Sequence, residues 1–312
     1  MRDGWKKALI IGTTAGLPRR WRVAARESGL SRLEEAKARR ARLLIIGHPK
    51  SGNTWLKLML SRLYQVRYGL PEELVHKTDE YTRVDPRVPR LAASNGHYSY
   101  ERAVARLFDG PDPVMKDKAV LLLARHPIDI AVSWYFQFTK RQSRHKQELI
   151  NANLAKPIDR HTIEMWEFVR HSEIGLVSLI DFLNGWQERI ERVDRAQMIR
   201  YEDLRTEPVK TLGQVTQLIG DPFGEDEIRA AVDYGSFDNV RALESQGYFK
   251  QGGLTLRNPD DPESFKVRRG KIGGYRDYFD DAQVAELEAI TRERLSPFFG
   301  YAALGASGST RT

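Results

Sequence analysis

Residues 47–55 combine glycines, a lysine and hydroxyl side chains in a pattern suited to binding phosphate. The segment reads Gly-His-Pro-Lys-Ser-Gly-Asn-Thr-Trp and follows the apolar run 43–47. A helical pattern from Asn53 to about Tyr68 comes directly after it. A loop between a buried strand and a helix N-terminus can present backbone N–H groups to an anion. The sequence therefore predicts a phosphate site at this loop.

The loop differs from the nucleotide-binding pattern G-x-x-x-x-G-K-[ST] at its lysine position. Gly47, Gly52 and Thr54 fit the spacing, but Asn53 stands where the lysine is required. The lysine of this loop is Lys50, on the other side of it. A kinase needs its lysine at the β- and γ-phosphates beside a metal ion. A P-loop nucleotide-dependent kinase is therefore the alternative function, which Asn53 and the lack of a convincing Walker B-type aspartate disfavour.

A second anion-binding segment follows the apolar run 119–124. Arg125 leaves the carboxyl end of this predicted strand and can pair with a phosphate. Pro127 suits the first turn of a helix, which places the hydroxyl of Ser133 in the second turn, within reach of the same anion. Arg-His-Pro alone is a common turn at a strand end. Together with the first loop it predicts two separate anion sites.

Both segments resemble the donor-binding motifs of PAPS-dependent sulfotransferases, where PAPS is 3′-phosphoadenosine 5′-phosphosulfate. Residues 49–55, Pro-Lys-Ser-Gly-Asn-Thr-Trp, resemble the family's 5′-phosphosulfate loop. Residues 125–135 resemble its 3′-phosphate motif, R-x-P-x-D-x-x-x-S-x-Y. The structural alternative for the first segment is a Gly/Pro turn with a surface lysine. A seven-residue match between a strand and a helix disfavours that alternative.

Three further segments resemble the family in the family's order. Residues 201–204 resemble the Y-E-D-L segment, whose tyrosine contacts adenine, and residues 236–237 resemble an S-F segment, whose phenylalanine stacks near the base. Residues 268–275 resemble the R-K-G-x-x-G-x-W segment that closes over the 3′-phosphate. Their structural alternatives are a strand-end tyrosine, a buried phenylalanine at a helix start and a solvated charge run. Tyr275 and Arg269 replace the usual tryptophan and lysine, and the family's Lys-Thr-His segment is missing.

The resemblance, over roughly residues 43–279, implies transfer of the sulfuryl group of PAPS to a hydroxyl, or less readily an amine, without a metal. The product of the donor is PAP, and Lys50 stabilises the leaving phosphate. The acceptor is a small molecule, a lipid or a carbohydrate, expected to face segments 68–112, 138–164 and 246–265. Its identity and the oligomeric state do not follow from the sequence. The donor-binding residues implied are Lys50, Ser51, Gly52, Asn53, Thr54, Trp55, Arg125, Ser133, Tyr201, Phe237, Arg268, Arg269 and Gly270.

We predict His97 as the base that activates the acceptor, because an imidazole can accept a proton near neutral pH. The resemblance places the family's base between the two anchors, which leaves His76 and His97 once His48 is assigned to packing within the loop. His97 ends the sequence Ser-Asn-Gly-His, loosely similar to a strand-end pair in related bacterial sulfotransferases. The alternative is a surface-loop histidine.

Short apolar runs alternate with helical patterns, which predicts an α/β fold. The resemblance makes it a P-loop NTPase-like parallel β-sheet flanked by helices on both faces, in a single domain with substrate-side insertions. Predicted strands are 43–47, 119–124 and 197–201, with 114–115 as an edge strand or a loop. Predicted helices are 53–68, one from 127 onwards, 161–192, 208–219, 225–234 and 281–294, and 246–269 is a long loop.

Charge is concentrated at the start of the chain of 312 residues, whose net charge is +8. Residues 1–42 hold 12 basic and four acidic side chains, so their excess equals that of the whole chain. We predict a basic helical arm over 1–42, the sulfotransferase domain over 43–300 and a flexible tail over 301–312. The arm is expected to be solvated, with peripheral contact to an anionic membrane as the alternative.

The composition excludes several classes of protein. Hydrophobic residues make up 41% and charged residues 29%, as in a globular chain. There is no cysteine, which excludes disulfides, thiolate metal sites and cysteine nucleophiles. The longest apolar stretches are short of a membrane span, and no nucleic-acid module interleaves aromatic and basic residues. We therefore expect a cytoplasmic enzyme that does not bind nucleic acid, with membrane-peripheral contact as the alternative.

Overall fold

Four parallel strands form a sheet at the centre of the chain, in the order β2-β1-β3-β4. The computed structural model describes residues 3–75, 78–111, 113–248 and 270–301. The strands are β1 (Leu43–Ile46), β2 (Leu91–Ser94), β3 (Ala119–Ala124) and β4 (Arg195–Arg200). The α-helices are α1 (Asp3–Thr13), α2 (Arg19–Arg40), α3 (Asn53–Tyr68), α4 (Thr78–Val84), α5 (Pro127–Phe136), α6 (Arg144–Asn151), α7 (Met165–Arg170), α8 (Leu176–Ile190), α9 (Tyr201–Thr206), α10 (Pro208–Ile219), α11 (Glu225–Tyr234), α12 (Phe237–Ser245) and α13 (Asp281–Arg294). Shorter helical turns are η1 (Glu72–Leu74), η2 (Ser99–Leu107), η3 (Gln137–Arg141), η5 (Gly274–Asp277) and η6 (Pro297–Phe299).

The sequences of the central strands explain why this sheet is parallel and covered. β1 is Leu-Leu-Ile-Ile, β3 is Ala-Val-Leu-Leu-Leu-Ala, and every residue of both is buried. Continuous apolar runs are typical of parallel strands with both faces covered. Leu43 pairs with Leu91 and Ala119, and Ala119 pairs with Arg195, so all four strands end at the same edge. The predicted α/β fold is confirmed.

Alternate side chains of β1 enter two cores, one on each face of the sheet. Leu43 and Ile45 pack with residues of α3, α10 and α11. Leu44 and Ile46 pack with residues of α8 and η2 and with the end of α2. Side chains alternate along a strand, so one short strand serves both cores. Helices cover both faces of the sheet, as predicted.

The fourth strand is not the run 114–115 that the sequence suggested. Residues 114–115 form a turn, with Met115 buried. The strand is β2, Leu-Ala-Ala-Ser, which pairs with β1. Its sequence has no β-branched or aromatic residue, so it carries little signal for a strand.

The predicted helix 161–192 is wrong as one continuous element. α7 ends at Arg170 and α8 begins at Leu176, with Gly175 as its N-cap. A Cβ at Gly175 would lie 2.3 Å from the carbonyl oxygen of Val169, so only glycine fits this turn. Tyr201, predicted as the last residue of a strand, begins α9 instead.

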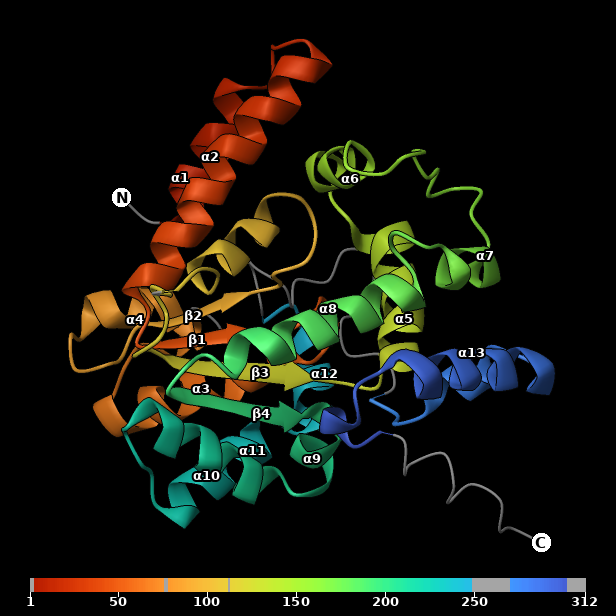
Figure 1. The fold of residues 1–312 in the computed structure, drawn as a ribbon. Helices are drawn as coiled ribbons and strands as arrows, with labels where there is room; N and C mark the ends of the chain where they lie inside the picture. Colours follow the sequence, from red (N-terminus) through yellow and green to blue (C-terminus); the bar gives the residue numbers. More distant parts are fainter. Residues whose placement is uncertain (1–2, 76–77, 112, 249–269, 302–312) are drawn as a thin grey trace, which may run out of the picture.

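Helices α1 and α2 lie against each other and form an arm, residues 3–40 (Figure 1). α2 packs on η2, and Leu30 is 1% exposed. Arg26 is buried too, and its guanidinium donates to Thr14 Oγ1 and to Glu148 Oε2, both at 2.9 Å. The expected solvated helix is therefore solvated on one side only. None of the helices in the described ranges combines the length and the hydrophobicity of a membrane span.

Candidate active site

The loop between β1 and α3 has the backbone shape of an anion cradle. Lys50 and Gly52 both have positive φ, 83° and 105°, and Gly52 is the N-cap of α3. A Cβ on Gly52 would lie 2.8 Å from the ring of Tyr201, so a side chain there has no room. Asn53 Nδ2 donates to the Gly47 carbonyl at 2.7 Å and ties the first turn of α3 to the loop. This arrangement leaves N–H groups at a helix N-terminus for an anion.

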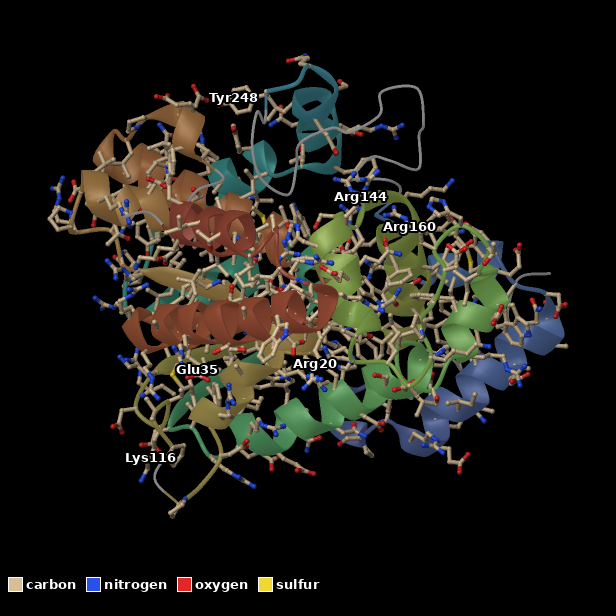
Figure 2. The ribbon with its side chains drawn as sticks, turned by 90° about the horizontal axis from the view of Figure 1, so that it is seen from above. Arg20, Glu35, Lys116, Arg144, Arg160 and Tyr248 are labelled. Carbon is tan, nitrogen blue, oxygen red and sulfur yellow. The ribbon has the colours of Figure 1, made fainter. Side chains whose placement is uncertain are left out.

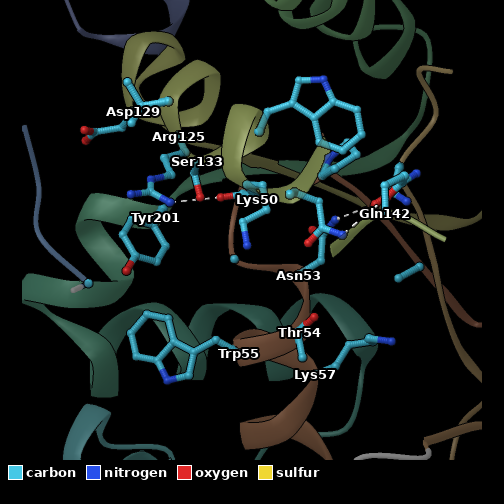
Figure 3. A pocket seen from close by; sticks show the side chains of 18 of the residues that line it. Lys50, Asn53, Thr54, Trp55, Lys57, Arg125, Asp129, Ser133, Gln142 and Tyr201 are labelled. Carbon is cyan, nitrogen blue, oxygen red and sulfur yellow. Dashed lines mark hydrogen bonds between the residues drawn. The ribbon is translucent and has the colours of Figure 1, made fainter. Parts of the chain in front are cut away.

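Arg125 connects this loop to the ends of the two neighbouring strands. It follows β3, and its Nη1 donates to the carbonyl of Lys50 at 3.0 Å. Its guanidinium carbon lies 4.4 Å from the centre of the Tyr201 ring, which follows β4. Ser133, on α5, lines the same cavity. Figure 3 shows Lys50, Ser133, Arg125 and Tyr201 grouped around one space.

Aromatic side chains border the cradle beside α3. Trp55 Nε1 donates to the Gly235 carbonyl at 2.6 Å, and the Trp55 ring meets Tyr201 edge to face at 5.7 Å. Phe237 begins α12, and a Cβ on Gly270 would lie 3.0 Å from its ring. Flat aromatic surfaces beside a phosphate site suit a nucleotide base.

Asp129 fixes the segment that closes the cavity on its α5 side. It lies in the first turn of α5, is 4% exposed and lines the cavity. Its Oδ2 accepts from the Gly273 N–H at 2.8 Å, and its Oδ1 accepts from the Tyr275 N–H at 3.1 Å. These bonds hold the chain just after Gly270, which also lines the cavity. The helix that carries Ser133 therefore also positions the closing segment.

These residues border a cavity of about 670 Å³ at the carboxyl edge of the sheet. Its donor half is the part at the phosphate loop, and its acceptor half extends to η2 and α6. Residues of the acceptor half are Tyr98, Ser99, Tyr100, Glu101, Val132, Trp134, Gln137, Gln142, Lys146, Leu149 and Ile150. Two of the three segments predicted to face the acceptor, 68–112 and 138–164, thus contribute to the cavity wall.

A buried charge cluster lies in the wall of the acceptor half. Glu101 is 8% exposed, and its Oε1 accepts from Lys146 Nζ and from Asn95 Nδ2, both at 3.1 Å. Asn95 follows β2, and its Oδ1 accepts from Asn53 Nδ2 at 3.5 Å. Burial alone would raise the pKa of Glu101, but Lys146 and Lys7 outweigh it and hold the pKa below its ordinary value. An ionised carboxylate therefore stands two hydrogen bonds from the phosphate loop.

His97 packs behind the cavity wall and is not among the side chains that line it. Its ring centre lies 3.9 Å from that of Tyr98 and 5.0 Å from that of His48, and its Nε2 is 3.1 Å from Ser178 Oγ. Burial lowers the pKa of His97 to about 3 and holds the pKa of His48 well below its ordinary value. The role of His97 as the base stays a prediction.

Two buried polar atoms without a protein partner lie at the cradle. Ser51 Oγ and Arg125 Nε have no hydrogen-bond partner among the residues that the structure describes. Buried polar atoms in proteins are nearly always paired. With the cations of Lys50 and Arg125 at the same place, the residues present fit a ligand that supplies anionic oxygens.

The structure brings most of the predicted donor-binding residues to this one cavity. Ser51 is buried under the loop, Arg268 and Arg269 lie outside the described residues, and so does His76.

Sequence reasoning missed Asn95, Glu101 and Lys146, since no motif marks them and only the folded sheet brings η2 and α6 together. Among the aromatic side chains near the acceptor half, Tyr98, Tyr100 and Trp134 line the cavity, while Tyr81 and Phe138 are core. The predicted donor-binding residues that line the cavity are Lys50, Gly52, Asn53, Thr54, Trp55, Arg125, Ser133, Tyr201, Phe237 and Gly270.

A parallel α/β sheet with an anion cradle after its first strand defines a P-loop-like protein. The family model described as "Sulfotransferase domain" matches residues 40–299, and the chain belongs to this family. A flavonol sulfotransferase-like protein of Flaveria bidentis is 23% identical, over 86% of this chain and 86% of its own. Cytosolic sulfotransferase 13 of Arabidopsis thaliana is 24% identical, over 83% of this chain and 78% of its own.

Solved structures of sulfotransferases share the fold. Mouse sulfotransferase SULT7A1 complexed with PAP is 18% identical with a TM-score of 0.53, over 81% of this chain and 83% of its own. Retinol dehydratase complexed with androsterone and the inactive cofactor PAP is 14% identical with a TM-score of 0.52, over 86% and 82%. The P-loop NTPase-like fold expected from the sequence is confirmed.

Proposed function

We propose that the protein transfers the sulfuryl group of PAPS to a hydroxyl group of a small-molecule acceptor, giving PAP and a sulfated product. The observation that supports this is the contact between the two anion-binding segments, Arg125 Nη1 to the Lys50 carbonyl at 3.0 Å. PAPS carries a 5′-phosphosulfate and a 3′-phosphate, so two adjoining anion sites beside aromatic rings suit it. PAP is held by the related SULT7A1 and retinol dehydratase structures.

The chain's own residues supply position and charge. Lys50 is a cation on the phosphate loop, where it can neutralise the charge that develops on the leaving phosphate oxygen. Arg125 and Ser133 offer donors to the second phosphate, and Trp55 and Phe237 offer faces to the base. PAPS itself supplies the activated sulfuryl group. In-line group transfer depends mainly on orientation and charge stabilisation, and it also needs a base for the proton of the acceptor.

We infer that Glu101 accepts the proton of the acceptor hydroxyl, in preference to the His97 predicted from the sequence. Glu101 lines the acceptor half, is ionised near neutral pH and is linked through Asn95 to Asn53 at the donor loop. His97 does not line the cavity. A base must reach the proton that it takes, which favours Glu101.

A thermal-shift titration tests the donor. PAP without metal should raise Tm, because it fills both anion sites, whereas ATP with Mg²⁺ has no 3′-phosphate and should raise Tm much less. An equal shift with ATP would contradict the proposal and favour a kinase. Incubation with PAPS and a panel of phenols and alcohols, followed by mass spectrometry of the products, then identifies an acceptor.

A further inference from the structure

The tip and the outer side of the arm expose large apolar side chains. Trp5 is 66% exposed, Leu9 55%, Leu17 39% and Trp21 63%. They are four of nine exposed large apolar side chains in the described parts of the chain. Trp5 lies towards the domain end of the arm, near the Asp3–Arg40 ion pair, and Leu17 and Trp21 lie at the opposite end, between and at the start of the two helices. We name these four the apolar arm surface. Exposed tryptophans on adjacent helices mark a surface that another phase or molecule covers.

Helix α1 exposes apolar side chains and points a lysine inwards, which is the reverse of an ordinary surface helix. Trp5 and Leu9 point outwards one turn apart, together with the exposed Ala8. Lys7 points inwards and donates from Nζ to Tyr100 Oη at 2.9 Å. Burial lowers the pKa of Lys7 to about 8, so this orientation has a cost for the folded chain. A helix on a water-exposed surface normally buries its apolar stripe.

The inward contacts fix the arm in this orientation. Ile10 and Val23 pack on a buried cluster formed by Leu30, Tyr100 and Leu149. The buried Arg26 bonds to Glu148 on α6 as well as to the turn between the two helices. The apolar arm surface therefore stays outward while the opposite side of the arm is bound to the domain.

We propose that the apolar arm surface docks the protein onto an anionic lipid bilayer. Arg19 and Arg20 are exposed next to Leu17 and Trp21, and the Arg20 guanidinium lies 5.7 Å from the Trp21 ring. Figure 2 shows Arg20 and Glu35 towards opposite ends of α2. Tryptophan beside arginine suits the boundary of acyl chains and anionic headgroups.

The charge of the arm favours an anionic bilayer over a second copy of the chain as the partner of this surface. Residues 1–42 hold 12 basic and four acidic side chains, and Arg22 and Arg26 pair with Glu148 on α6 while Arg19 and Arg20 are exposed beside the apolar arm surface. A two-fold dimer through this surface would bring the exposed arginines of two arms together, which their like charge opposes. An anionic membrane attracts the same charge, at a strength that grows with each basic residue near the surface.

Sedimentation with vesicles tests the proposal on the full chain. The protein should bind vesicles of phosphatidylcholine and phosphatidylglycerol in equal parts, and brominated acyl chains should quench its tryptophan fluorescence. Trp5→Ser with Trp21→Ser should lower the partition coefficient by about 100-fold, because two indole rings no longer enter the interface. Arg19→Gln with Arg20→Gln should lower it by about 30-fold on these vesicles and little on pure phosphatidylcholine.

The matched control replaces Val66, 56% exposed, and Phe298, 41% exposed, with serine, and it should bind vesicles as the wild type does. Equal loss in this control, or binding without quenching, would overturn the proposal. So would light scattering that shows a dimer of the wild type and a monomer of the tryptophan double variant. Because binding is read without turnover, none of these outcomes depends on the donor or the acceptor.

Discussion

Lys50 and Arg125 touch each other, yet we expect their loss to affect different steps. Arg125→Ala should weaken PAP binding by about 2–5 kcal/mol, since it removes a charge-assisted partner of a bound phosphate. Lys50→Ala should lower kcat even at saturating PAPS, because the charge that it meets grows as the bond to the sulfuryl group breaks. Titration calorimetry with PAP and steady-state kinetics measure the two effects.

Lys210→Ala is the control for both variants, since Lys210 and its ion-pair partner Glu207 are exposed and neither lines the cavity. It should leave PAP affinity and kcat unchanged. A Lys50→Ala enzyme that turns over at the wild-type rate would contradict the leaving-group role.

Glu101→Gln should keep PAP affinity and lose about 10²–10⁴-fold in turnover, as expected for removal of a general base. The amide also leaves Lys146 without its carboxylate partner, so a structural loss must be separated from a chemical one. The double variant Glu101→Gln with Lys146→Met removes both charges and should stay as inactive as the single variant.

His97→Asn should retain turnover on this reasoning, after correction for any fall in Tm. Restored activity in the Glu101/Lys146 double variant would show that Glu101 acts only by pairing with Lys146. Loss of activity in His97→Asn with wild-type activity in Glu101→Gln would return the role of base to His97.

At the scale of elements, Asp129 couples α5 to the segment after Gly270, because its two oxygens accept the N–H groups of Gly273 and Tyr275. Asp129→Asn turns one acceptor into a donor that faces an N–H group. We expect a loss of about 1–3 kcal/mol in the free energy of unfolding. We also expect weaker PAP binding, since Gly270 shifts at the cavity. Calorimetry with PAP and urea denaturation measure both, and Asp281→Asn on the exposed start of α13 is the control. Unchanged PAP affinity would contradict the coupling.

The elements that the sequence predicted well are those whose pattern is strong over a short range. β1 and β3 are continuous apolar runs, and the phosphate loop keeps its glycines and lysine within a few residues of one strand end. β2 was not predicted, because the sequence Leu-Ala-Ala-Ser carries no local strand signal and only its pairing with β1 defines the strand. Asn95 and Glu101 follow β2, so they could not be placed at the site before that strand was. The pairing of Glu101 with Lys146 joins positions 45 residues apart, which no spacing rule foresees.

At the scale of the whole molecule, the buried histidines make stability depend on pH. His48, His97 and His126 are held neutral because burial lowers the pKa of each below the ordinary 6.5. The unfolded chain therefore binds more protons than the folded chain below this pH. Their contribution to stability is complete above pH 6.5 and is lost as the pH falls through the folded pKa, which for His97 is about 3.

His97→Asn tests this dependence, because asparagine does not titrate. Between about pH 7.5 and about pH 5, a histidine that stays neutral loses about 2 kcal/mol relative to one that protonates freely. The free energy of unfolding should therefore fall by about 2 kcal/mol less in His97→Asn than in the wild type over this range. Urea denaturation at both pH values measures it, with His161→Asn, on an exposed turn, as the control. Parallel curves for the wild type and His97→Asn would show that His97 takes up its proton without unfolding, and that the interior around it admits the charge.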